Sequence, residues 1–164
     1  MAASTVIKNF RDATVVFADG TTPTPLSLTL ALESGDFAIT GLSESNTEAT
    51  AYLDRGELGS VRKSSRSFPT FSVSCHMADL SDASDKLIWD AINKTGAFAL
   101  AVSTITGSDV YGLKITLTIE GTNFGDAADH VLTMSGCHCT IDFAEGDPNS
   151  FTINGTVYGT ITAT

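Results

Sequence analysis

Apolar and polar residues alternate along most of the chain, as they do in β-strands that bury one face. Rows with this alternation begin at Leu26, Phe37, Phe71, Leu113 and Phe151. The polar positions between them are rich in Ser and Thr, which suits half-buried antiparallel sheets. We therefore predict a mainly β fold, an antiparallel β-sandwich or barrel-like domain.

Two Ser-Gly segments interrupt this alternation, and each predicts a change of direction. Ser34-Gly35 separates the first two rows, and we expect a tight hairpin turn there. At Ser135-Gly136 the phase changes, because apolar residues occupy even positions up to Met134 and odd positions from Cys137. A one-residue slip turns every side chain to the other face, so a bulge here predicts one long, bent strand.

Residues 82–94 have the spacing of an amphipathic helix instead. Ser81 or Asp82 can cap its N-terminus, and Gly96 is suited to a left-handed residue that ends it. The apolar stripe consists of Leu80, Ala83, Leu87, Ile88, Ala91 and Ile92. Trp89 lies at the edge of this stripe, and we expect it to pack into the core against a sheet.

The alternation lapses between residues 54 and 67, which predicts a long loop. Irregular segments of this length are uncommon inside compact domains and are usually functional or disordered. The segment contains four of the nine basic residues of the chain, together with two apolar residues that could anchor it in a contact. We expect the loop to dock on another copy of this acidic protein. The suspected contact residues are Arg55, Leu58, Val61, Arg62, Lys63 and Arg66.

Charge and length narrow the function classes. The 164 residues favour a single domain, 1–164, and the net charge of −10 disfavours binding to nucleic acid, which requires Lys and Arg against phosphates. The longest wholly apolar run has six residues, 97–102, so we expect no membrane helix. The N-terminus lacks the apolar core of a signal peptide, and three cysteines are an odd number. These features predict synthesis in a reducing cytoplasm.

No motif predicts catalysis or a cofactor. Cys137 and Cys139 project to one face of a strand and His138 to the other, so one zinc ion cannot bind all three. His76 and His138 fall on polar strand faces, and we interpret both as solvated or interface residues. Asp142, Glu145 and Asp147 lack the spacing of a calcium-binding loop, and we interpret them as residues of a turn. We therefore predict no enzyme, no metal and no cofactor.

In their order along the chain, these features resemble the tail tube (major tail) proteins of long, flexible-tailed bacteriophages. The resemblance spans nearly the whole chain. It rests on an N-terminal arm at 1–12, the strand ending in Phe17-Ala18-Asp19-Gly20, the stretch from Leu53 to Pro69 that leads into a long strand, the helix with Leu87-Ile88-Trp89-Asp90-Ala91, and long strands ending in Gly155-Thr156-Val157-Tyr158-Gly159.

The resemblance implies a structural virion protein of the tail, a β-sandwich with one flanking helix that assembles into stacked hexameric rings. One sheet of each subunit would join its neighbours in a barrel around the channel for DNA ejection, and residues 54–67 match the inter-subunit loop. The N-terminal arm, 1–12, and the C-terminal strand and tail, 150–164, would add contacts. Implied partners are further copies and the tape measure, tail terminator and tail tip proteins, while genomic DNA passes without specific binding. Glu44 and Glu48 are candidates for acids that face the lumen.

A second function remains open at this point: a β-sandwich binding module for carbohydrate or a host surface. Such modules usually present aromatic platforms. The candidate aromatics, Tyr52, Trp89, Tyr111 and Tyr158, are not clustered in the sequence.

Overall fold

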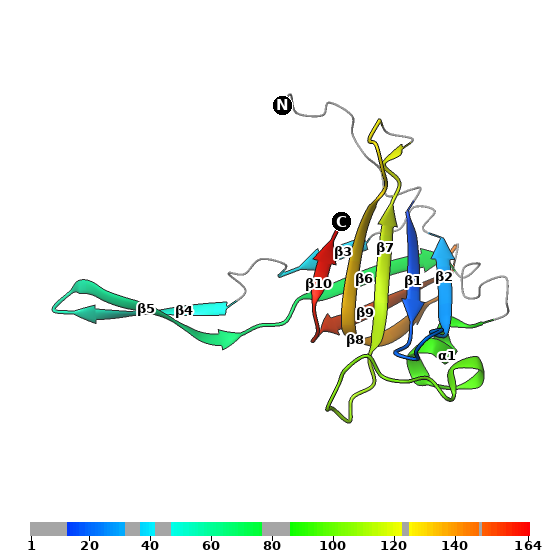
Figure 1. Ribbon diagram of the computed structural model, residues 1–164, viewed down its shortest axis with the longest axis horizontal. Helices are drawn as coiled ribbons and strands as arrows, with labels where there is room; N and C mark the ends of the chain where they lie inside the picture. Colours follow the sequence, from blue (N-terminus) through cyan, green and yellow to red (C-terminus); the bar gives the residue numbers. More distant parts are fainter. Residues whose placement is uncertain (1–12, 32–36, 42–46, 77–85, 123–124, 148) are drawn as a thin grey trace.

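The computed structural model describes residues 13–31, 37–41, 47–76, 86–122, 125–147 and 149–164, most of which form antiparallel strands (Figure 1). The strands are β1 (Thr14–Ala18), β2 (Ser27–Ala31), β3 (Phe37–Thr40), β4 (Thr47–Asp54), β5 (Glu57–Arg66), β6 (Thr70–His76), β7 (Leu113–Ile119), β8 (His130–Ala144), β9 (Ser150–Val157) and β10 (Ile161–Ala163). The helix α1 spans Ile88–Asn93, and a 3-10 turn, η3, spans Gly96–Phe98. The predicted mainly β fold is confirmed.

The main sheet has the order β2-β1-β7-β8-β9-β6-β3, and β10 pairs with β8 beside this path. It folds over into two layers because the long strand β8 belongs to both (Figure 1). The first layer contains β2, β1, β7, β10 and the first half of β8. The second layer contains the second half of β8 with β9, β6 and β3. The result is a β-sandwich in which the strands of the two layers cross.

The core lies between these layers and is built from the alternating apolar residues. Leu28, Phe17 and Ile115 represent the first layer, and Val73 and Ile153 the second; each is fully buried. Burial of one face on each strand explains why the period-two pattern is so regular there.

The predicted bend in β8 is confirmed. Leu113 pairs with Cys137 and Ile115 with Met134, so β8 uses one more residue than β7 over this interval. Gly136 has a φ of 63°, a left-handed conformation that suits glycine. The extra residue changes the phase of β8 and allows its second half to join the other layer.

The predicted hairpin around Ser34-Gly35 is wrong, because the strands before and after these residues do not pair with each other. These two residues lie outside the described part of the chain, but the strands on either side are placed: β2 pairs with β1 and β3 pairs with β6. They occupy opposite ends of the strand order. The sequence pattern gives the face that each strand buries, not its neighbour, and that is why the pairing was mispredicted.

The helix begins later than expected. Leu87 is extended, with φ −93° and ψ 140°, so α1 starts at Ile88 rather than at Asp82; the predicted caps at Ser81 and Asp82 lie outside the described residues. At the other end Lys94 is left-handed, and the predicted terminator Gly96 also has a positive φ, 46°. An added Cβ at Gly96 would meet the Asp90 carboxylate, which would have to move aside.

Trp89 is not a core residue, contrary to expectation. It is 47% exposed, while Ile88 and Ala91 are fully buried. A helix of six residues has room to bury only one narrow face, and α1 uses Ile88 and Ala91 for it. The indole therefore lies at the surface, against Phe143.

Candidate functional site

The segment predicted as a loop at 54–67 is a β-hairpin, which corrects the sequence interpretation. β4 and β5 pair only with each other among the described strands and form a separate two-stranded sheet. Arg55 and Gly56, with φ of 52° and 87°, form the two-residue turn, where glycine tolerates the left-handed conformation. The hairpin extends away from the sandwich to one side of the molecule (Figure 1). We call residues 47–66 the arm.

A bulge at Gly59 gives the arm one apolar face. Tyr52 pairs with Ser60, but Leu53 pairs with Leu58, so Gly59 is the additional residue. Paired residues share a face, so Leu58 lies with Leu53, and Val61 joins them through its partner Ala51. Leu53, Leu58 and Val61 are 65%, 63% and 57% exposed. Large apolar side chains with this exposure indicate a contact surface.

The predicted contact residues of the arm divide between its two faces. Lys63 lies on the apolar face beside Val61, because it is two residues further along β5. Arg62 lies on the opposite face, and its guanidinium carbon is 5.8 Å from the centre of the Tyr52 ring, a cation–π contact. Arg55 forms part of the turn, and the side chain of Arg66 lies outside the described structure.

The two candidate lumen acids differ in how far the structure describes them. Glu44 lies outside the described residues, and Glu48 lies in β4 with its side chain outside them. Since β4 belongs to the arm, Glu48 is on the projecting hairpin and not on the main sheet.

The outer face of the second layer carries a band of small polar side chains, which we call the hydroxyl face. Its members, read across the registers of β3, β6, β9 and β8, are Ala38, Thr40, Thr70, Ser72, Ser74, Thr152, Asn154, Thr156, His138, Thr140 and Asp142. Its titratable members are Asp142 and His138, and no Lys or Arg is among the residues named. The Ser and Thr alternation was visible in the sequence, but the strand order that gathers it on one face was not.

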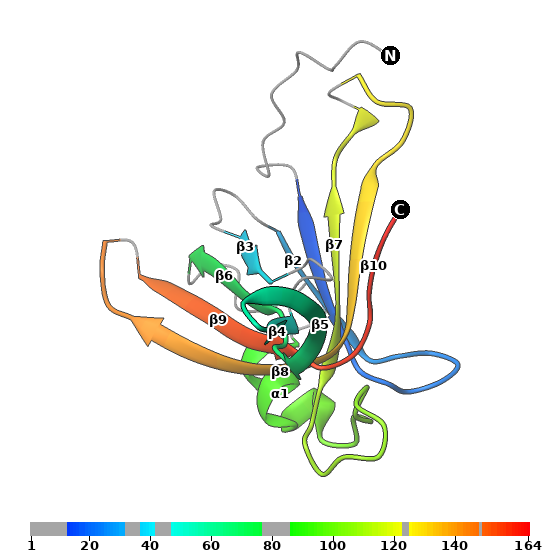
Figure 2. The same ribbon diagram turned by 90° about the vertical axis from the view of Figure 1, so that its left-hand side faces the viewer.

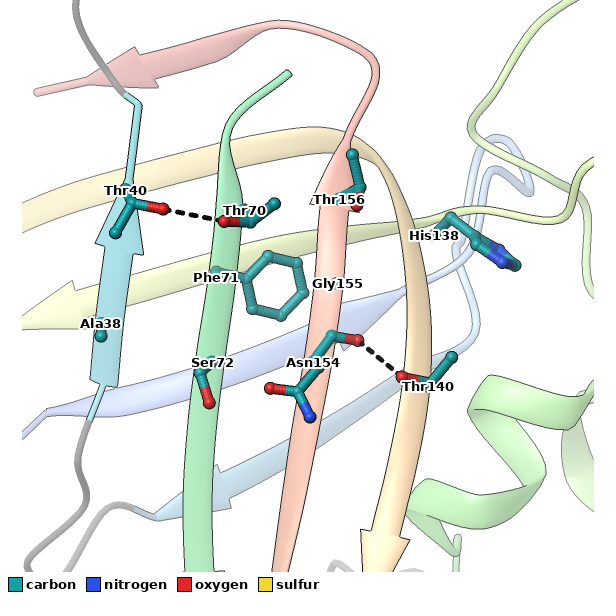
Figure 3. Close-up of a pocket in the computed structure, with 10 residues that line it drawn as sticks. All are labelled: Ala38, Thr40, Thr70, Phe71, Ser72, His138, Thr140, Asn154, Gly155 and Thr156. Carbon is teal, nitrogen blue, oxygen red and sulfur yellow. Dashed lines mark hydrogen bonds between the residues drawn. The ribbon is translucent and has the colours of Figure 1, made fainter. Parts of the chain in front are cut away.

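A shallow groove of about 330 Å³ runs over this face, and Figure 3 shows its lining side chains. Thr40 and Thr70 are hydrogen-bonded at 2.8 Å, and the hydroxyl of Thr140 donates to the backbone carbonyl of Asn154 at 3.4 Å. The ring of Phe71 fills the space over Gly155, where an added Cβ would come within 2.4 Å of it (Figure 3). The groove thus offers neutral hydroxyl and amide groups.

Among the side chains that the structure describes near this groove, the titratable groups do not form a reactive pair. His138 Nδ1 is 3.1 Å from the Tyr111 carbonyl oxygen, so this nitrogen carries the proton and donates. Burial raises the pKa of Cys137 to about 12 and raises that of Cys139 further, so both thiols stay protonated near neutral pH. As predicted, both lie on the face opposite His138. The side chain of His76 lies outside the description.

Asp19 is a buried charged residue that sequence reasoning missed. It is 2% exposed and accepts hydrogen bonds from the backbone N–H of Leu26 at 2.7 Å and of Val102 at 3.0 Å, and from the Thr21 hydroxyl. Burial by itself would raise the pKa of Asp19, but these hydrogen bonds outweigh it and lower the pKa. Asp19 thereby connects the β1–β2 turn to the segment after η3, a structural role.

Two features are absent from the described part of the chain. In the ranges that the structure describes, no three His, Cys, Asp or Glu side chains gather as a metal site. Within the same ranges, no helix has the length and apolarity needed to cross a membrane.

Comparison with known proteins gives similarity of structure without similarity of sequence. No family model matches the chain, and no curated protein matches it significantly. Solved structures that contain a similar chain include an extracellular contractile injection system, PVC sheath/tube terminator in extended state (12% identity, TM-score 0.58, 99% of both chains). They also include the anti-feeding prophage baseplate (10% identity, TM-score 0.55, 100% of this chain and 97% of the other) and the anti-feeding prophage cap, a tube-terminating cap (14% identity, TM-score 0.55, 100% of this chain and 94% of the other). At these identities the likeness establishes a shared fold over essentially the full length of both chains.

Proposed function

We propose that this chain is a structural subunit of a phage-tail-like tube that assembles with further copies of itself. The observation that carries the proposal is the arm, a projecting hairpin with three large apolar side chains more than half exposed. A two-stranded hairpin is marginally stable in water by itself. A hairpin of this kind gains stability when its apolar face is covered by another protein surface.

Charge supports another copy as the surface that covers the arm. Residues 47–66 carry four basic and three acidic side chains, whereas the whole chain has nine bases and nineteen acids. The arm is therefore the basic part of an acidic protein, and identical subunits attract each other where arm meets body.

The second layer fits the role of a channel wall. β3 and the second half of β8 are its two edges, and among the described strands neither has a partner on its outer side. Joining these edges between copies would close the sheet into a barrel and remove both exposed edges. The hydroxyl face would then line the channel mostly with hydroxyl and amide groups, and none of its named residues is a Lys or Arg that could bind DNA phosphates.

The similar solved chains support a tail-like assembly. They occur in a sheath/tube terminator, a baseplate and a tube-terminating cap of contractile injection systems. Within this proposal, the resemblance to flexible-tailed phages adds hexameric rings, DNA ejection, and tape measure, terminator and tail tip proteins as partners. A terminator or cap subunit is the second candidate, favoured by the same structures.

Electron microscopy of the purified protein tests the proposal. We expect rings or tubes from the intact chain and monomers after replacement of residues 48–65 by a short Gly-Ser linker, with the sandwich still folded. Tubes of unlimited length indicate a tube subunit, and single rings that do not stack indicate a terminator. A chain that stays monomeric at high concentration with its arm intact would contradict both.

A further inference from the structure

Two half-exposed aromatic residues form a patch at the end of the sandwich near α1. Trp89 of α1 and Phe143 of β8 are 47% and 49% exposed, and their ring centres are 5.9 Å apart. Phe143 also contacts the fully buried Phe151, with ring centres 6.5 Å apart. The patch is thus the surface end of a row of aromatic rings that continues into the core. We call Trp89 and Phe143 the aromatic patch.

Two acidic residues lie close in the sequence to the aromatic patch. Glu145 and Asp147 follow Phe143 in the exposed turn between β8 and β9. No Lys or Arg occurs after Lys114, so the last 50 residues of the chain contain six acids and no such base. The aromatic patch therefore combines exposed apolar rings with two acids that lie close to Phe143 in the sequence.

The arm has the complementary chemistry. Its apolar face presents Leu53, Leu58 and Val61, and Lys63 lies on that same face. The arm extends from one end of the molecule's longest axis, and α1, the helix that contains Trp89, lies toward the other end (Figure 1). Figure 2 looks along the arm and shows the β8–β9 layer behind it. One chain cannot fold its own arm onto its own patch without a rearrangement, so the complementary surfaces belong to different copies.

We propose that the aromatic patch of one copy receives the apolar face of the arm of the next copy. Leu58 and Val61 pack on Trp89 and Phe143, and Lys63 meets the carboxylates of Glu145 and Asp147. Because arm and patch are different surfaces, the contact is head-to-tail and propagates into a ring or a helical filament. This inference rests on the proposed function and names the surface that the arm contacts.

A double substitution of the patch, Trp89→Ser with Phe143→Ser, tests the contact. Sedimentation velocity should show association weakened roughly tenfold or more, as expected when central aromatic residues of an interface are removed. The control is Val110→Ser, because Val110 is also a half-exposed apolar residue but lies outside the patch; it should associate like the wild type. Wild-type association by the folded double variant would overturn the inference.

Charge reversal provides a second test that does not depend on the stability of the patch. Lys63→Glu should weaken association, and Glu145→Lys with Asp147→Lys in the same chain should restore it. A photo-crosslinker at position 58 should label peptides containing Trp89 or Phe143 of another copy.

The outcomes separate the two proposals. If the wild type assembles and needs its arm, but crosslinks elsewhere and tolerates the patch substitutions, only this inference is wrong. If the wild type never self-associates, the proposed function is wrong as well. Glycan binding by a monomer that is lost with Trp89→Ser would replace both with the carbohydrate-binding module.

Discussion

Asp19 is a single buried side chain that joins the β1–β2 turn to the segment after η3, 83 residues further along the chain. Replacement by Asn keeps the size of the side chain but removes the charge that strengthens its hydrogen bonds to Leu26 and Val102. We expect Asp19→Asn to lower the free energy of unfolding by about 2 kcal/mol, within the range for hydrogen bonds to charged groups. Urea unfolding measures the change. Asp109→Asn, at an exposed acid, is the control and should have almost no effect.

The lowered pKa of Asp19 also gives a pH dependence with a definite sign. Its ordinary value is 3.8, and the folded value lies below this. As pH falls, Asp19 in the unfolded chain therefore takes up a proton before Asp19 in the folded protein does. The contribution of the Asp19 carboxylate to the free energy of unfolding is complete above its ordinary pKa and is lost as the pH falls below that value. We expect the stability difference between wild type and Asp19→Asn to be constant near neutral pH and to shrink below about pH 4. A difference that is unchanged down to pH 2 would contradict the lowered pKa.

At the scale of elements, the arm should behave as a unit separate from the sandwich. Its strands pair only with each other among the described strands, and an isolated hairpin opens easily. We expect the amides of residues 47–66 to exchange hydrogen rapidly in the monomer and slowly after assembly, while β1 and β7 stay protected in both states. Hydrogen exchange read by mass spectrometry measures this. An arm as protected in the monomer as β7 would show that it needs no covering surface.

Elements were predictable from the sequence where burial imposes a pattern on them. β2, β6, β7 and β9 each bury one face, so their alternation is regular, and the bulge at Gly136 was visible because both halves of β8 bury a face. Both faces of the arm are exposed and Gly59 shifts its register, so no alternation marked it as a hairpin.

The residues of the candidate site, too, could be predicted from the sequence only in part. Leu58, Val61 and Lys63 could be chosen from the sequence, because a basic segment with apolar residues is unusual in an acidic chain. Trp89 and Phe143 are 54 positions apart and meet only through the packing of α1 on β8, so their pairing has no local signal. The hydroxyl face likewise depends on the strand order.

For the whole molecule, the net charge of −10 should make assembly dependent on salt. Approaching copies repel each other over the Debye length, which falls from about 30 Å at 0.01 M salt to about 8 Å at 0.15 M. The contact between Lys63 and the acids of the β8–β9 turn acts over a few ångströms and is screened less once it is formed and partly buried. We therefore expect assembly to be faster at 0.15 M sodium chloride than at 0.01 M, which light scattering measures.

The choice of salt separates charge repulsion from the hydrophobic part of the contact. Sodium chloride and sodium sulphate at equal ionic strength screen charges equally, whereas sulphate also strengthens apolar burial. Equal acceleration by both salts would indicate that repulsion between whole subunits limits the rate of assembly. Greater acceleration by sulphate would indicate that burial of the apolar face of the arm limits it. Slower assembly in either salt would contradict the expectation, because attraction between the basic arm and an acidic body would then outweigh the repulsion between whole subunits.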